Sequence, residues 1–275
     1  MKLSVCIQTP EIKIEIPVAL LSGSFEQKLE KAAVLGYDAV ELMVGRPEEL
    51  DPKKIRKQLR DVNLAVSAVG SGPVFMVDGL TLLASDLEVC DRAQERLFDL
   101  LEFSAEVEAR TVTVGSFRGR SEWYIAGDPR ERLKESLSKA AVRANDLGVR
   151  IVLEPLNRYE SDIINTTADA LNFIEETGDS NIGILLDTYH INIEEPSFYS
   201  CIVEAHMEER MWHIHIGDSN RLPPGHGHID FSGIAHILAK IGYRGFLSAE
   251  LLPVPDPDRA AEETAHYLRR LVSLM

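Results

Sequence analysis

Apolar and polar positions follow two patterns that alternate along the chain. Eight short apolar runs have the length and side-chain types of buried strands, and between them apolar residues recur every three or four positions, as on one face of an α-helix. Strands are expected at residues 2–7, 38–44, 64–70, 111–116, 150–155, 182–187, 212–217 and 246–251. Helices are expected at 24–36, 51–62, 87–109, 128–148, 167–178, 204–210, 231–242 and 256–275. This eightfold alternation predicts an α/β fold, a single (β/α)8 TIM barrel, rather than an open doubly wound sheet.

Several expected helices have residues at their ends that usually start or stop a helix. Asp128 followed by Pro129 marks one start, and Thr167 is expected to cap another. Glycines follow the last turn of four helices, at Gly36, Gly148, Gly178 and Gly242. With 275 residues, 45% of them hydrophobic, the chain can bury one large core, so residues 1–275 are expected to form one domain.

Charge and cysteine content exclude several classes of partner. The formal net charge of −15 repels phosphate backbones and anionic membrane surfaces, so neither nucleic acid nor membrane is expected as a partner. The three cysteines lie far apart, which supports neither a disulfide framework nor a thiolate zinc site. The N-terminal stretch is too short and too broken for a secretory signal, and no apolar run reaches membrane-spanning length. We expect a cytoplasmic protein.

Four side chains that commonly bind metals lie at the ends of expected strands. They are Glu154, Asp187, His215 and Glu250, separated by 33, 28 and 35 residues, about the length of one strand and its returning helix. In a parallel barrel the carboxyl ends of all strands meet on one rim, where the connecting loops form the active site. Charged groups at the ends of apolar strands are costly to bury unless they are paired or bind a metal. The spacing therefore predicts that the four bind one divalent metal ion.

The distribution of histidine narrows the kind of metal site. All eight histidines lie at or after residue 190, so the first four strands supply no histidine ligand to a multi-zinc cluster. His213 and His215 point the same way along one strand; His215 is nearer the strand end and is the expected ligand, while His213 is expected to be a hydrogen-bonded interior residue. Three carboxylates and one imidazole suit Mn²⁺, the expected ion, with Co²⁺ and Mg²⁺ as alternatives and Zn²⁺ also possible.

The segments around these residues resemble a known family. LEPLNRYESD, LLDTYHINIEE, HIHIGDSNRLPPGHGHIDF and SAELLP are similar to motifs of the ketose 3-epimerase branch of the xylose-isomerase-like barrels, which includes D-tagatose and D-psicose 3-epimerases. The resemblance implies that Glu154, Asp187, His215 and Glu250 hold the metal. It also implies that Glu160, His190 and Arg221 contact the sugar, and that the barrels form homo-oligomers such as dimers or tetramers.

The chemistry of such a family accounts for two glutamates at the metal. Inverting a carbon beside a carbonyl requires removal of its C–H proton from one face and delivery of a proton to the other, so a base must lie on each side. Glu154 and Glu250 are the expected catalytic pair, acting through a cis-enediolate whose charge the metal stabilises. The expected partner is a small ketose or keto sugar acid, and no nucleotide or flavin is required.

Some residues and functions have alternatives. Arg118 and Arg120 follow the fourth strand and could bind a substrate carboxylate, as in relatives that act on 5-keto-L-gluconate, or could be solvated loop residues. Arg221 could pair with Asp218 instead of contacting a sugar. Rival functions are an aldose-ketose isomerase of the hydroxypyruvate-isomerase type, a DNA repair enzyme of the endonuclease IV type, and a noncatalytic sugar-binding module. The endonuclease would need histidines on early strands, which this chain lacks.

Overall fold

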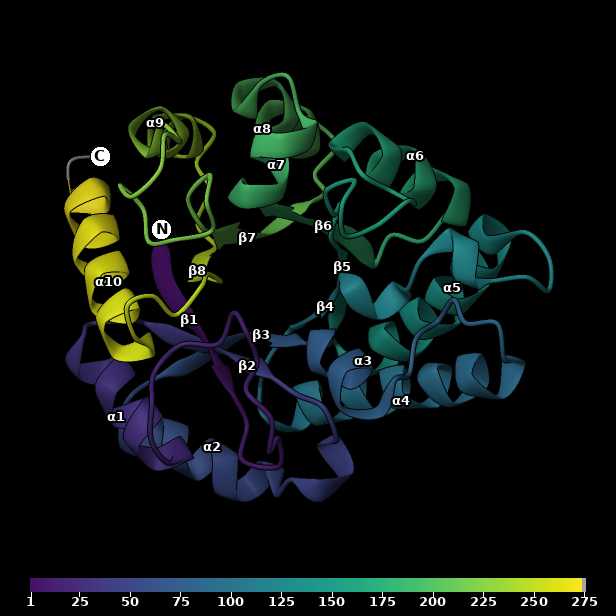
Figure 1. The fold of residues 1–275 in the computed structure, drawn as a ribbon, viewed down its shortest axis with the longest axis horizontal. Coiled ribbons are helices and arrows are strands. Elements are labelled where there is room, and N and C mark those ends of the chain that lie inside the picture. The colour runs from purple at the N-terminus through teal and green to yellow at the C-terminus, as the bar shows by residue number, and fades with distance from the viewer. Residues whose placement is uncertain (274–275) are drawn as a thin grey trace.

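Eight parallel strands close into a barrel in the computed structural model, which describes residues 1–273 (Figure 1). The strands pair in sequence order and β8 pairs with β1, so the predicted TIM barrel is confirmed. Each observed strand overlaps the expected one. Their bounds are β1 Lys2–Gln8, β2 Ala39–Met43, β3 Ala65–Gly70, β4 Thr111–Val114, β5 Arg150–Leu153, β6 Ile182–Asp187, β7 Met211–Ile216 and β8 Phe246–Ala249.

Helices surround the barrel and return the chain from the end of one strand to the start of the next (Figure 1). Their bounds are α1 Phe25–Val34, α2 Pro52–Asp61, α3 Gly72–Asp78, α4 Leu87–Glu106, α5 Pro129–Leu147, α6 Thr167–Thr177, α7 Thr188–Glu194, α8 Phe198–Met207, α9 Phe231–Lys240 and α10 Pro257–Ser273. The described residues also form three short 3-10 helices, which are η1 Pro47–Glu49, η2 Ser116–Arg118 and η3 Ser121–Trp123. The helix expected over 256–275 is described as far as Ser273, and its last two residues lie outside the described part.

The helix ends follow the local sequence closely. Asp128 caps α5 by accepting a hydrogen bond from the Arg130 N–H, as expected. The cap of α6 is Thr166 rather than Thr167, because the Thr166 side chain accepts from the Asp169 N–H and Asp169 bonds back to the cap. Gly148 ends α5 with a φ of 67°, a left-handed conformation that glycine adopts without steric cost.

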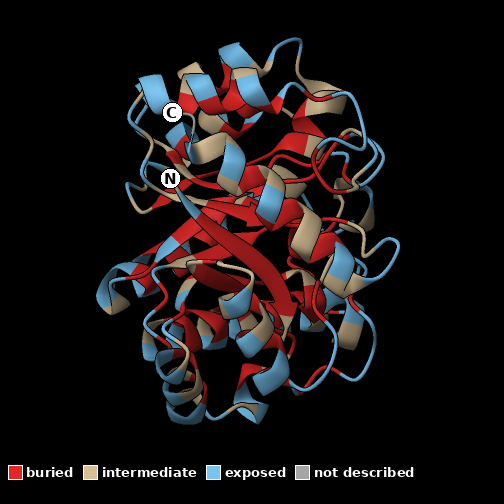
Figure 2. Ribbon diagram, turned by 90° about the vertical axis from the view of Figure 1, so that its left-hand side faces the viewer, coloured by how far each residue is buried: buried red, intermediate tan, exposed pale blue. Residues whose placement is uncertain are grey.

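Strand register brings the carboxyl ends of the later strands level with one another. Asp187 at the end of β6 is the direct partner of His215 in β7. Ile216 pairs with Ala249, so Glu250 follows at the same height. Figure 2 shows the strands as a continuous buried layer, with exposed residues on the outer faces of the helices. The barrel is therefore a packed core that opens only at its rims.

None of the helices within residues 1–273 combines the length and the apolar content needed to cross a membrane.

Candidate metal centre and active site

The structure brings together all four predicted metal ligands. Glu154 and Glu250 are the first residues beyond β5 and β8, Asp187 ends β6, and His215 lies near the end of β7. Each offers one nitrogen or oxygen within 4.8 Å of those of the other three. All four residues are buried, none more than 8% exposed. They form a single enclosed cluster on the catalytic rim.

Several atoms of this cluster are buried without a hydrogen-bond partner among the described residues. These atoms are Glu154 Oε1, Asp187 Oδ2 and His215 Nδ1. Buried polar atoms in folded proteins are almost always paired, so three convergent exceptions need a missing partner. A cation accounts for all three, because every one of them is an electron-pair donor. Glu154, Asp187, His215 and Glu250 therefore fit a divalent ion, and their oxygen-rich composition suits hard or borderline metals.

Asp187 is oriented by the helix that follows it. Its Oδ1 accepts a hydrogen bond of 2.7 Å from the Tyr189 N–H and thereby caps α7. Its Oδ2 is left facing the cluster. Burial raises the pKa of Asp187 to about 7, an effect that Arg221 opposes and the neighbouring glutamates reinforce. The ionised form of Asp187 is therefore favoured over the protonated form when a positive charge lies close to it.

Glu154 and Glu250 have opposite electrostatic environments although they are neighbours. Burial raises the pKa of Glu154 above its usual value. Burial would also raise the pKa of Glu250, but His215 and Arg221 outweigh it and lower this pKa to about 2. Arg221 donates a 2.8 Å hydrogen bond from Nη2 to Glu250 Oε2. Carboxyl groups whose environments differ in this way are typical of acid–base pairs.

His190 lies beside the cluster as a neutral imidazole. Its Nδ1 accepts hydrogen bonds from the Asn157 side-chain amide at 2.8 Å and the Asn157 N–H at 3.3 Å. Its Nε2 therefore carries the proton and lies 3.8 Å from both Glu154 Oε1 and Asp187 Oδ2. Burial and the positive charge of Arg221 lower the pKa of His190 to about 3. The ring thus presents an N–H donor at neutral pH.

Arg221 spans the mouth of the site. Besides Glu250, it contacts Glu160 Oε1 through Nη1 at 3.3 Å, and its guanidinium lies 5.0 Å from the centre of the Tyr189 ring. The alternative pairing with Asp218 is not observed, because the Asp218 carboxylate instead accepts backbone N–H groups of its own loop. Arg221 has a φ of 59°, a left-handed conformation that non-glycine residues seldom adopt and that often marks functional sites.

A cavity of about 210 Å³ opens over the cluster, and its two sides differ in character. Polar groups from the second half of the barrel line one side: Glu154, Glu160, His190, Arg221 and Glu250. The opposite side comes from the first half and is mainly apolar or small, including Ile16, Val18, Met43, Gly70, Met76 and Gly115. The volume is below the roughly 300–1,000 Å³ of pockets for drug-sized ligands and suits a small polar molecule.

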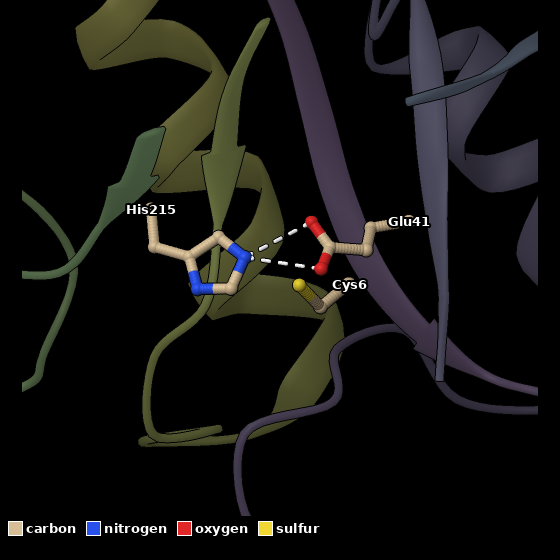
Figure 3. Close-up of side chains that lie close together, drawn as sticks. All are labelled: Cys6, Glu41 and His215. Carbon is tan, nitrogen blue, oxygen red and sulfur yellow. Dashed lines mark hydrogen bonds and ion pairs between the residues drawn. The ribbon is translucent and has the colours of Figure 1, made fainter. Parts of the chain in front are cut away.

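Sequence reasoning missed two residues of the site. Asn157 holds His190 as described above. Glu41, in the middle of β2, is fully buried and contacts both His213 and His215. Figure 3 shows its contact with His215. His213 is thus a hydrogen-bonded interior residue, as expected. The signal that could have revealed Glu41 is an acidic residue inside the otherwise apolar run AVELMV, since such a group needs a buried partner.

Arg118 and Arg120 do not line the cavity. The Arg118 side chain is fully buried and donates to the Glu154 carbonyl oxygen at 2.7 Å and to those of Ile163 and Ile164 at 3.0 Å. Burial lowers the pKa of Arg118 to about 10, which Glu154 and Asp162 partly oppose. Arg120 pairs with Glu122 at the surface. Both alternatives are therefore wrong for Arg118. It is not a solvated loop residue, because its side chain is fully buried, and backbone carbonyl groups rather than a substrate carboxylate occupy its guanidinium.

Comparison with known proteins places these features among sugar-converting enzymes. The family described as xylose isomerase-like TIM barrel matches residues 29–271. A ketose 3-epimerase of Arthrobacter globiformis is 34% identical over 222 residues, 79% of this chain and 74% of that protein. A 3-dehydro-D-guloside 4-epimerase of Escherichia coli is 30% identical, over 80% of this chain and 88% of its own. The solved structure of an L-ribulose 3-epimerase superimposes with a TM-score of 0.82 at 27% identity, covering 98% of this chain and 94% of that one.

Proposed function

The chain belongs to the xylose isomerase-like TIM barrel family, and from this premise we propose that it is a metal-dependent ketose 3-epimerase. It is a carbohydrate epimerase and hence an isomerase, like its curated relatives. The observation that carries the finer proposal is the cluster of Glu154, Asp187, His215 and Glu250, whose unpartnered atoms converge beneath the cavity. Two members of the cluster, Glu154 and Glu250, are also walls of that cavity.

Glu154 and Glu250 exchange protons with the carbon that is inverted. One carboxylate removes the C–H proton beside the carbonyl, and the electron pair moves to the carbonyl oxygen to give a cis-enediolate. The other, which begins protonated, delivers its proton to the opposite face of the same carbon. The roles reverse in the return reaction, so substrate configuration decides which glutamate acts first. Both residues line the cavity, so their carboxyl protons exchange with solvent between turnovers.

Neighbouring residues bind and orient the sugar. The neutral His190 donates its Nε2 hydrogen to a substrate oxygen, because Asn157 occupies the other ring nitrogen. Arg221 and Glu160 contact one another at the cavity mouth and offer donors and an acceptor to sugar hydroxyl groups. A divalent ion held by Glu154, Asp187, His215 and Glu250 would supply electrophilic stabilisation of the negative charge that develops on the substrate. We expect Mn²⁺, with Co²⁺, Mg²⁺ and Zn²⁺ as alternatives to compare after chelation.

The decisive test follows the inverted carbon in D₂O. The protein, supplied with Mn²⁺, is incubated with D-psicose, D-tagatose and L-ribulose, and the products are analysed by NMR. One deuterium at C3 of the product is expected, and its absence there would overturn the proposal. Glu250→Gln removes one base and should reduce turnover by at least roughly 10²–10⁴-fold while sugar binding persists. Glu122→Gln is the matched control, because Glu122 is an exposed acid that pairs with Arg120.

A second candidate is inversion at C4 of a 3-keto sugar, favoured by the similarity to the Escherichia coli 4-epimerase. The same pair of glutamates would serve, because that carbon is also adjacent to a carbonyl. A keto sugar acid is less well supported, since Arg118 is occupied by backbone carbonyl groups. The isomerase, endonuclease and sugar-binding alternatives have no support from the relatives described. A single domain, a homo-oligomeric assembly and a cytoplasmic location stay predictions.

A further inference from the structure

Glu41 is an acidic side chain enclosed inside the barrel, below the metal cluster. It is fully buried in β2 and accepts hydrogen bonds from His213 Nε2 at 2.8 Å, His215 Nε2 at 3.0 Å and Ser248 Oγ at 2.7 Å. Figure 3 shows the Glu41 carboxylate facing the ring edge of His215, with Cys6 beside it. No lysine or arginine contacts this carboxylate among residues 1–273.

A fully buried carboxylate whose close polar partners are two histidines and a serine is costly, and apolar side chains usually fill this part of a parallel barrel. Replacing a whole buried ionic network with apolar side chains of similar volume often leaves stability unchanged or improves it. Glu41 is therefore poorly explained as packing. The negative charge of Glu41 can instead act on a cation in the metal cluster through the imidazole of His215, because that ring lies between Glu41 and the cluster.

The hydrogen bond to Glu41 determines which ring nitrogen of His215 carries the proton and which one offers a lone pair to the cluster. A neutral imidazole carries one proton, and Nε2 must carry it in order to donate to Glu41. Nδ1 is then left with a lone pair, lies 3.6 Å from both Glu154 Oε1 and Glu250 Oε2, and has no hydrogen-bond partner among the described residues. A carboxylate behind a ligating histidine fixes its tautomer and makes it a stronger donor.

We propose that Glu41 is a positioning residue that holds His215 as the Nε2–H tautomer, so that Nδ1 binds the divalent ion. The proposal rests on the metal-dependent function above. A second metal ion bound between Cys6, Glu41 and His215 explains the arrangement of these three side chains less well. The His215 Nε2 to Glu41 distances of 3.0 and 3.1 Å are hydrogen-bond lengths, and the intervening space is already filled by a proton.

Metal affinity tests the proposal independently of turnover. Metal-free wild type, Glu41→Gln and Cys6→Ala are titrated with Mn²⁺ and followed by isothermal calorimetry and by the EPR signal of free Mn²⁺. Glu41→Gln keeps the side-chain shape but can donate to Nε2 and so favours the wrong tautomer. Its dissociation constant for Mn²⁺ should rise by about 10–100-fold. Cys6→Ala is the matched control, because Cys6 is equally buried and bonds to Ser248 rather than to Glu41 or His215.

The outcomes separate this inference from the proposed function. A wild type that binds no divalent ion would refute the metal-dependent function, whereas equal Mn²⁺ affinity of wild type and a folded Glu41→Gln would refute only the role of Glu41. If Glu41→Gln does not fold, ¹⁵N NMR of histidine-labelled wild type loaded with Zn²⁺ decides the matter. A proton on His215 Nε2, with the ion on Nδ1, is expected. A proton on Nδ1 would overturn the inference.

Discussion

Replacing Arg118 with methionine tests whether this buried cation supports the active-site loops. Its guanidinium donates to the carbonyl oxygens of Gly115, Glu154, Ile163 and Ile164. Those of Gly115 and Ile163 keep a second donor, the Arg118 N–H and the Ser161 hydroxyl respectively. Those of Glu154 and Ile164 have no other donor within residues 1–273, so Arg118→Met leaves two buried carbonyl groups unpaired.

The expected loss follows from those two groups. Each buried unsatisfied carbonyl costs about 1–3 kcal/mol, so the free energy of unfolding should fall by roughly 2–6 kcal/mol. At about 2–4 °C per kcal/mol, a loss near the middle of this range lowers Tm by about 10 °C. Thermal and urea unfolding of the metal-free protein, followed by circular dichroism at fixed pH, measure both quantities. Arg120→Met is the control and should change stability by less than about 0.5 kcal/mol, since Arg120 pairs only with a surface glutamate.

One result would refute this reasoning. If Arg118→Met unfolds at the wild-type temperature and selectively loses affinity for keto sugar acids relative to neutral ketoses, the guanidinium faces the substrate. Substrate binding, not support of the loop carbonyl groups, would then be the role of Arg118.

Two further predictions concern the metal cluster. A Cβ added at Gly115 would collide with Glu154 Oε2, and the carboxylate would have to move by about 1 Å to reach an ordinary contact distance. Gly115→Ala should therefore lower kcat/KM by about 10²-fold in steady-state assays. Wild-type activity of this variant would contradict the prediction. Mn²⁺ binding should weaken as pH falls below about 7, because burial raises the pKa of Asp187 to about 7 and its proton must leave before the carboxylate can bind the ion. Calorimetry in buffers of different ionisation enthalpy should detect more protons released at pH 6 than at pH 8, and equal release would contradict the assignment.

The parts of the fold set by periodicity were predictable from sequence. All eight strands lie where apolar runs occur, because burial on both faces leaves a continuous hydrophobic stretch. Strand ends then located Glu154, Asp187, His215 and Glu250 on one rim, and the structure places them together. Helices α3 and α7 were missed because each spans only seven residues, too few for an amphipathic pattern. Helix α8 begins at Phe198, before the expected start at residue 204.

Contacts that depend on side-chain direction could not be predicted. Sequence reasoning correctly placed Arg118 after the fourth strand, but η2 turns its side chain away from the cavity and toward loop carbonyl groups. Glu41 stood within an apolar strand, where only the barrel geometry reveals that its face meets His215 across the interior. Neighbours of this kind are more than 30 residues apart in the chain and share no local pattern.

The contrast between the two sides of the cavity has an evolutionary consequence. Reactive groups come from β5 to β8, whereas the surfaces that determine the shape available to a sugar, such as Ile16, Met43 and Met76, come from the first half of the chain. Loops of the amino-terminal half can therefore diverge, or be grafted from a relative, without disturbing proton transfer. Three residues constrain such an exchange: a transplanted β2 must carry an acid at the height of Glu41, and the segment after β4 must keep Gly115 and Arg118, which contact Glu154. Recombination at the midpoint of the barrel is thus a practical route to new sugar specificities.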